Sequence, residues 1–354
     1  MRRAYLLTLV AVAGWSVGPV CGKTLLKAEG PGGHPHPVEV AFWAIAAGWV
    51  LLLGYLVARR RLRWLGELAW RGWIVLVLMG LFGWAGYAWW LNVALARLPV
   101  PDAIVINYLH PVFTVVFQGA MFGAVVRRVS GWEEAGERRR PRAATLGVAL
   151  GLCLLGVAVM ATHGHPSALG RVSSAAGAMA ALFAAFAWGV YSNLGRFVAV
   201  RGGRAQSVPA DVQTVAAMTF GLAMLAAVLV TGGVSGTPSS WHAQLLLPGS
   251  RSVDVSAWHV VGVMGLALYC IGFTAWLAAL DAGRQAGAPH RLPPLTYFAP
   301  VLGIVLARLL LQEPFGAGFW QGAALIAVGN LVIALTRASP FGFAQGRRSP
   351  RPDS

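Results

Sequence analysis

Charged residues and cysteines are scarce in this chain of 354 residues. Charged side chains make up 11% of it and hydrophobic side chains 57%, which is too apolar for an ordinary soluble domain. The three cysteines, Cys21, Cys153 and Cys270, stand in separate apolar stretches, and this argues against a disulfide framework or a zinc knuckle. We therefore expect lipid to be the solvent, and we expect no cofactor and no metal.

Long polar domains are missing as well. Ten apolar stretches of roughly 20 residues follow one another along the chain. The first runs from Ala4 to Gly22, and the others are centred near Trp49, Trp84, Val115, Leu152, Phe183, Ala223, Leu268, Ile304 and Ala327. A stretch of that length crosses a bilayer as a helix, which bonds its own backbone groups. The sequence predicts an all-α integral membrane protein with ten transmembrane helices.

Positive charge collects in every second gap between these stretches. The net charge is +16, and most of the 28 Lys and Arg residues fall in the gaps that are cytoplasmic if the N-terminus is cytoplasmic. That asymmetry follows the positive-inside rule. It predicts a multi-pass protein of the cell inner (plasma) membrane with both termini in the cytoplasm. No nucleic acid is expected as a partner, because no basic run carries interleaved aromatic residues.

The two halves of the chain share a pattern. Residues of the same type recur at matching places in the pairs Trp15 and Trp188, Trp90 and Trp276, Tyr108 and Tyr297, and Pro111 and Pro300. Repeats with an odd number of helices must be inverted in the membrane, so we expect two inverted five-helix repeats. The first is 1–163, with a cytoplasmic loop at 127–142, and the second is 171–336. Residues 337–354 are expected to form a disordered cytoplasmic tail.

Two fragments resemble a known family. INYLHPVFTVVF and LLLQEPFGAGFWQGAALIAVGNLVIAL are similar to segments of the EamA-type drug/metabolite transporter superfamily, and the first resembles its amino-acid exporter branch in particular. The resemblance runs from about Leu6 to Thr336. It departs at the corner after the fourth helix, where Gly123 and Ala124 stand without the glutamate that Glu313 supplies in the second half. The resemblance implies a permease that moves a small organic solute.

Candidate site residues come from the repeated positions. Trp15, Trp90, Tyr108, Trp188, Trp276 and Tyr297 are predicted walls of a substrate cavity, because indole and phenol rings combine an apolar surface with one polar group. Asn107 and Asn193 are predicted polar contacts. Pro111 and Pro300 are predicted helix kinks that free a backbone carbonyl. Each of these side chains also has a structural reading, as an interfacial aromatic residue or as a bond between helices.

His110 is a special candidate, because an ionisable group inside a membrane is by default a functional hypothesis. Its reference pKa near 6.5 suits a proton carrier, and a neutral histidine bonded to a neighbouring helix is the alternative. Asp281 and Glu313 are read as structural charges at loop edges. No pair of carboxylates is placed for hydrolysis, so an enzyme is not expected.

The predicted function is a secondary transporter, an exporter of small organic metabolites such as amino acids, that works by alternating access. Its expected partners are a small-molecule solute and the lipid bilayer, and a homodimer stays open. Two alternatives from other classes are a membrane-embedded enzyme acting on a lipid-linked substrate and a non-transporting membrane sensor or scaffold.

Overall fold

The structure is a computed structural model. It describes residues 2–30, 33–117, 143–162, 164–165, 172–201, 208–233, 236–247, 251–285, 292, 295–296, 298–313, 315 and 318–335. The predicted loop 127–142, the predicted tail 337–354 and Tyr297 lie outside the described residues.

Helices dominate the first half of the described chain. They are α1 (Arg2–Leu26), α2 (Pro37–Ala58), η1 (Arg61–Glu67), α3 (Trp70–Met79), η2 (Gly80–Gly86), α4 (Tyr87–Arg97), α5 (Val100–Asn107), α6 (His110–Val116) and α8 (Ala143–Ala161). Local sequence sets several of their ends. At the start of α2, for example, Pro37 takes the first turn, and His36 and Glu39 form a capping box that satisfies free N–H groups.

The second half is also mainly helical and contains a β-hairpin. Its elements are α9 (Val172–Leu194), η5 (Gly195–Phe197), α10 (Ala210–Thr231), η7 (Pro238–Ser240), β1 (His242–Leu247), β2 (Arg251–Ser256), α11 (Ala257–Met264), η8 (Gly265–Gly272), α12 (Phe273–Gln285), α13 (Phe298–Leu310) and α14 (Phe319–Leu335).

Six helical stretches among the described residues are long and apolar enough to cross a membrane. They are Arg2–Leu26, Pro37–Ala58, Trp70–Arg97, Ala175–Leu194, Ala210–Thr231 and Ala257–Leu280. Shorter apolar helices follow at Gly147–Gly156, Phe298–Leu310 and Phe319–Gly329. The expectation of a helical membrane protein is confirmed at this level, whereas the count of ten spans and the inverted repeat stay predictions.

Two of the long stretches contain a π-helical segment at matching places. In the first half η2 joins α3 to α4, and in the second half η8 joins α11 to α12. A π-helical turn widens the helix and often occurs at functional sites. Gly80 begins η2, and a Cβ there would come within 2.7 Å of the Ala217 carbonyl oxygen. The missing side chain therefore lets α10 pack directly against the widened turn.

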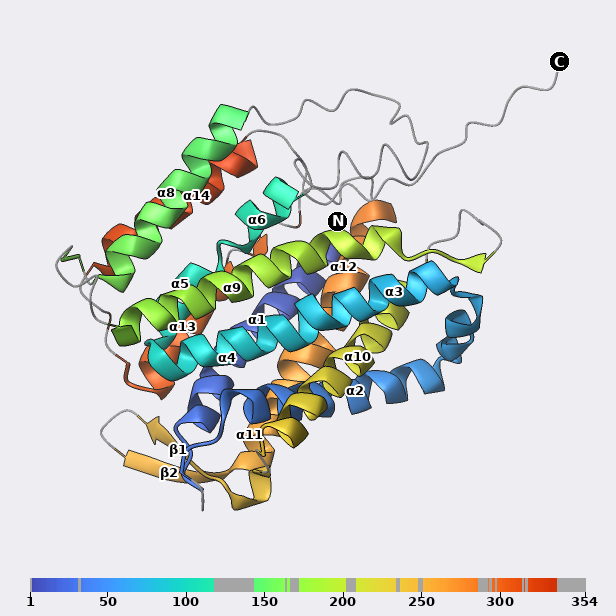
Figure 1. The fold of residues 1–354 in the computed structure, drawn as a ribbon, viewed down its shortest axis with the longest axis horizontal. Helices are drawn as coiled ribbons and strands as arrows, with labels where there is room; N and C mark the ends of the chain where they lie inside the picture. The colour runs from blue at the N-terminus through green and yellow to red at the C-terminus, as the bar shows by residue number, and fades with distance from the viewer. Residues whose placement is uncertain are drawn as a thin grey trace.

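The helix contacts also match between the halves. α1 packs against η8, α12 and α13, while α9 packs against η2, α4, α5 and α6. α2 contacts η8, and α10 contacts η2. α8 and α14 pair with each other beside the remaining helices, as Figure 1 shows in green and red. This arrangement puts α1, η2–α4, α9 and η8–α12 around a common centre.

Among the described residues, a β-hairpin departs from the all-α prediction. β1 and β2 pair antiparallel, from His242 opposite Ser256 to Leu247 opposite Arg251. An isolated bridge joins Glu29, just beyond the end of α1, to His242. The turn residues Pro248 and Gly249 between the two runs are the sequence signal for this hairpin, whereas β1, with the sequence HAQLLL, lacks β-branched and aromatic residues. We call this end of the helix bundle the hairpin end (Figure 1).

Candidate functional site

A cavity of about 250 Å³ lies at the centre of the helices. Its walls come from both halves of the chain. α1, η2, α4, α5 and α6 contribute from the first half, and α9, α10, η8, α12 and α13 from the second. Seven of the sequence-predicted residues line it: Trp15, Asn107, Tyr108, His110, Trp188, Trp276 and Pro300.

Aromatic rings form much of the wall. The Trp15 ring lies edge-on to the Trp276 ring at a centroid distance of 5.7 Å. On another side, the Trp188 ring lies 4.7 Å from the Tyr87 ring and 5.0 Å from the Tyr191 ring. Rings at such distances attract one another beyond simple burial. The wall is therefore a rigid apolar surface that fits a flat or apolar part of a solute.

Several polar atoms in this wall are left without a hydrogen-bond partner. They include the indole nitrogen of Trp15 and the side-chain oxygens of Asn92 and Asn107. The amide nitrogens are used, because Asn92 donates to the Ala88 carbonyl oxygen at 2.8 Å and Asn107 donates to the Tyr87 hydroxyl at 3.3 Å. A buried polar atom without a partner costs free energy, so these atoms keep an unused capacity for hydrogen bonding.

His110 lies beside two of the rings. Its imidazole centroid is 5.2 Å from the Tyr108 ring and 6.1 Å from the Trp188 ring. Tyr108 in turn donates its hydroxyl hydrogen to the Thr296 carbonyl oxygen at 3.4 Å. Apart from tyrosines, His110 is the ionisable side chain among the described residues that line the cavity. Its role as a proton carrier stays a prediction.

Trp90 is not where the sequence pattern put it. It is 37% exposed, stacks on Trp89 and packs near Phe183 on the outside of α4. The cavity face of this helix instead carries Trp84, Tyr87, Ala88, Leu91, Asn92 and Leu95, which recur every three or four residues. Trp90 falls between these positions and so points away from the cavity.

Asn193 is also outside the cavity. Its amide nitrogen donates to the Thr114 carbonyl oxygen at 2.9 Å and to the Gly189 carbonyl oxygen at 3.0 Å. Because Thr114 belongs to α6 and Asn193 to α9, the amide ties two helices together. The structural reading of this residue replaces the predicted substrate contact.

The two repeated prolines mark helix starts instead of bends inside continuous helices. α5 ends at Asn107, and Pro111 stands in the first turn of α6. Pro300 likewise stands in the first turn of α13. Proline fits the first turn because its missing N–H would have no helical partner there. Tyr108 and Leu109 therefore separate two short helices, α5 and α6.

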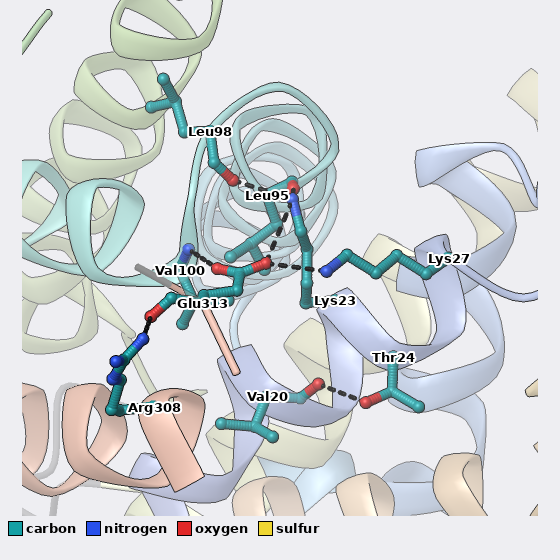
Figure 2. Close-up of polar contacts among 9 residues, drawn as sticks. All are labelled: Val20, Lys23, Thr24, Lys27, Leu95, Leu98, Val100, Arg308 and Glu313. Atoms are coloured by element: carbon teal, nitrogen blue, oxygen red, sulfur yellow. Dashed lines mark hydrogen bonds and ion pairs between the residues drawn. The ribbon is translucent and has the colours of Figure 1, made fainter. Parts of the chain in front are cut away.

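A charged cluster lies at the hairpin end, next to the cavity residue Leu95 (Figure 2). The Leu95 side chain lines the cavity, while its carbonyl oxygen accepts a hydrogen bond from the Lys23 ammonium. That ammonium also donates to the Leu98 carbonyl oxygen at 2.9 Å and lies 3.8 Å from the Glu313 carboxylate. Sequence reasoning treated Glu313 as a structural charge and did not foresee that it meets Lys23.

The opposite side of the cavity reaches the start of α10. Gln213 and Thr214 line it there, and Gln213 donates to the Val208 carbonyl oxygen at 2.9 Å. Asp211, in the same first turn, forms an ion pair with Arg61 of η1. Within the described ranges no group of three or more His, Cys, Asp or Glu side chains is arranged to hold a metal ion.

Comparison with known proteins agrees with this architecture. The EamA-like transporter family matches residues 2–130 and 175–335, which is most of the chain. The chain belongs to the EamA-like transporter family. The resemblance drawn from the sequence motifs is confirmed, and this EamA-like protein is a multi-pass membrane transporter rather than an enzyme, with a small-molecule solute and membrane lipid as partners.

Curated relatives match a smaller part of this EamA-like chain. It is 36% identical over 76 residues to the aromatic amino acid exporter YddG of Salmonella typhimurium (strain 14028s / SGSC 2262), covering 22% of the chain and 25% of the relative. It is also 36% identical over 69 residues to the aromatic amino acid exporter YddG of Escherichia coli (strain K12), covering 20% and 23%. The matched segment thus spans about a quarter of each exporter.

A solved crystal structure shares the fold of the EamA-like chain. The two superpose with a TM-score of 0.55 at 24% sequence identity, and the match covers 94% of this chain and 96% of the other. At that identity the likeness extends to the fold alone.

Proposed function

We propose that this transporter exports small amphipathic metabolites, such as aromatic amino acids, across the plasma membrane by alternating access. The observation that carries the proposal is the central cavity, whose aromatic wall holds buried polar atoms without partners. A ring of the solute would pack among Trp15, Trp188 and Trp276. Its polar groups would bond to the Trp15 indole nitrogen and to the oxygens of Asn92 and Asn107. The named activity of the YddG relatives supports the same solute class.

The proposed mechanism uses two inverted five-helix repeats, 1–163 and 171–336. Matching π-helical segments and matching helix contacts in the two halves support this division. In this mechanism the charged cluster would close the hairpin end, whereas the cavity reaches the start of α10 on its other side. With both termini in the cytoplasm, as the charge pattern predicts, the hairpin end faces outward and the form described here is closed to the outside. Rocking of one repeat against the other would open that end and release the solute.

Uptake into proteoliposomes tests the proposal. Purified protein is reconstituted, and movement of labelled phenylalanine, tryptophan and lysine is followed against protein-free vesicles. We expect the two aromatic amino acids to move faster than lysine, because the described lining holds no acidic side chain to pair with a second ammonium. Lysine moving as fast as the aromatic solutes would contradict the proposed solute class. A protein that moves none of them would instead favour a sensor or scaffold.

A further inference from the structure

The charged cluster at the hairpin end joins three separate segments of the chain. Lys23 lies in the last turn of α1, and its ammonium binds the carbonyl oxygens of Leu95 and Leu98 at the end of α4. The last carbonyls of a helix have no partner within it and carry the negative end of the helix dipole. The Lys23 ammonium satisfies both needs, and it fixes α1 against α4 just beyond the cavity.

Glu313 completes the cluster from the segment after α13. Its carboxylate accepts the Val100 N–H at 2.6 Å and lies 3.0 Å from the Lys27 ammonium. Arg308 donates to the Glu313 carbonyl oxygen at 3.2 Å. The carboxylate therefore takes the role of a cap at the start of α5, where a negative charge is stabilised by free N–H groups.

Asp102 is a second buried carboxyl group near this cluster, and it takes no part in the ion pairs. It stands in the first turn of α5, is 3% exposed, and its Oδ1 atom is buried without a hydrogen-bond partner. Glu313 already occupies the Val100 N–H. In the part of the chain that the structure describes, Asp102 forms no ion pair, whereas Glu313 pairs with both Lys23 and Lys27.

The surrounding helices add little positive charge near this carboxyl. α5 packs against α1, α4, α9, α13 and α14. The charged groups on these elements toward the hairpin end are Lys23 and Lys27, which pair with Glu313, Arg97, which is exposed, and Arg308, which binds a carbonyl oxygen. α9 and α14 carry no charged side chain. Burial disfavours the charged form of the Asp102 carboxyl, and the like charge of Glu313 adds to this effect.

We propose that Asp102 is a proton-binding site that is loaded when the hairpin end of the cavity closes and emptied when that end opens. A buried carboxylate oxygen without a donor is costly when charged, and binding a proton from solution removes the charge by forming an O–H bond. Opening separates the cluster and lets water reach the carboxyl, which then releases the proton to the solvent. Acid thus favours closure, and alkali favours opening. The inference rests on the proposed function in taking the hairpin end as the outward end.

Thiol labelling from outside tests this site. The native cysteines Cys21, Cys153 and Cys270 are replaced by alanine, and Leu91, which lines the cavity on α4, is replaced by cysteine. A membrane-impermeant thiol reagent is added to right-side-out vesicles at several pH values. Rates are divided by those of a second protein carrying the exposed substitution Ser239→Cys, which removes the effect of pH on the thiol reaction itself. Labelling at Leu91→Cys then reports how often the hairpin end is open.

We expect the corrected labelling rate to rise at least about fivefold between about pH 6 and pH 8, because one proton can change an equilibrium by up to tenfold per pH unit. Asp102→Asn, which cannot ionise, should label slowly at every pH. Asp102→Glu should keep a pH-dependent rate. Asp254→Asn is the matched control, since this exposed carboxylate lies on β2 at the same end and outside the cluster.

A pH-dependent rate in Asp102→Asn would overturn the proposal, and so would a flat rate in the parent or in Asp102→Glu. The glutamate variant keeps the test decisive if the asparagine variant does not fold. Because no solute is present, the result is separate from the solute class. Proteoliposomes that fail to move aromatic amino acids while labelling follows pH would remove the proposed solute and leave the proton site.

Discussion

The rings of Trp84 and Tyr269 lie with their centroids 5.7 Å apart, although one belongs to η2 and the other to η8. Both line the central cavity, so the two π-helical segments meet at its wall. Trp84 is 1% exposed and Tyr269 3%. The two halves of the protein therefore contact each other through widened helical turns. A change in the packing of these turns would change the shape of the cavity wall.

Replacing Trp188 by leucine should weaken solute binding. The substitution removes ring contacts with Tyr87 and Tyr191 and with any aromatic solute, and such contacts are each worth ~0.5–1.5 kcal/mol. We expect KM for an aromatic amino acid to rise by about two- to tenfold in proteoliposome transport. Trp90→Leu is the control, because this ring faces away from the cavity and its loss should leave KM unchanged.

The two asparagines should behave oppositely. Asn193→Ala removes the bond between α9 and α6 and should lower the free energy of unfolding by about 1 kcal/mol, seen as a lower melting temperature, without a change in KM. Asn107→Ala removes an unpartnered oxygen from a residue that lines the cavity and should raise KM. A raised KM in Asn193→Ala with normal stability would restore the role that the sequence pattern suggested.

Gly80→Ala should destabilise the protein. The added Cβ would lie 2.7 Å from the Ala217 carbonyl oxygen and from the Phe220 Cβ, so α10 must move outward. Overpacking of this kind costs ~1–3 kcal/mol and should lower the melting temperature in detergent. Gly54→Ala on α2 is the matched control, because nothing lies within 4 Å of the added carbon. Equal melting temperatures for the two variants would argue against the close approach of α10 and η2.

Labelling of single cysteines should place the end of α4 and the end of α12 on opposite sides of the membrane. Arg97→Cys lies at the end of α4 and Gln285→Cys at the end of α12, and both positions are exposed. Inverted repeats require an impermeant reagent to reach the first from outside and the second from the cytoplasm. If both are labelled from one side of right-side-out vesicles, the inverted repeat is wrong.

His110→Ala should flatten the pH dependence of solute transport if the imidazole carries a proton during the cycle. It should leave the pH dependence of thiol labelling at Leu91→Cys intact, because the proposed proton site is Asp102 in the first turn of α5, whereas His110 lines the cavity. Transport with an unchanged pH profile would remove His110 as a proton carrier and retain it as a wall of the cavity beside Tyr108.

The sequence by itself determined the solvent, the helical class and the family. Long apolar stretches force helices because lipid offers no hydrogen bonds to the backbone, and the motif around Tyr108 and Pro111 is typical of the EamA-like transporters. Repeated positions also pointed to Trp15, Trp188 and Trp276, which meet at the cavity.

Only the tertiary structure decided which face of each helix looks inward. In a bilayer both the lipid-facing and the protein-facing residues are apolar, so hydrophobic periodicity does not separate Trp90 from Trp84. The meeting of Lys23 with Glu313 and the isolation of Asp102 depend on packing between distant segments. No local sequence pattern predicts the contact between Lys23 and Glu313, because these two residues are almost 300 positions apart in the chain.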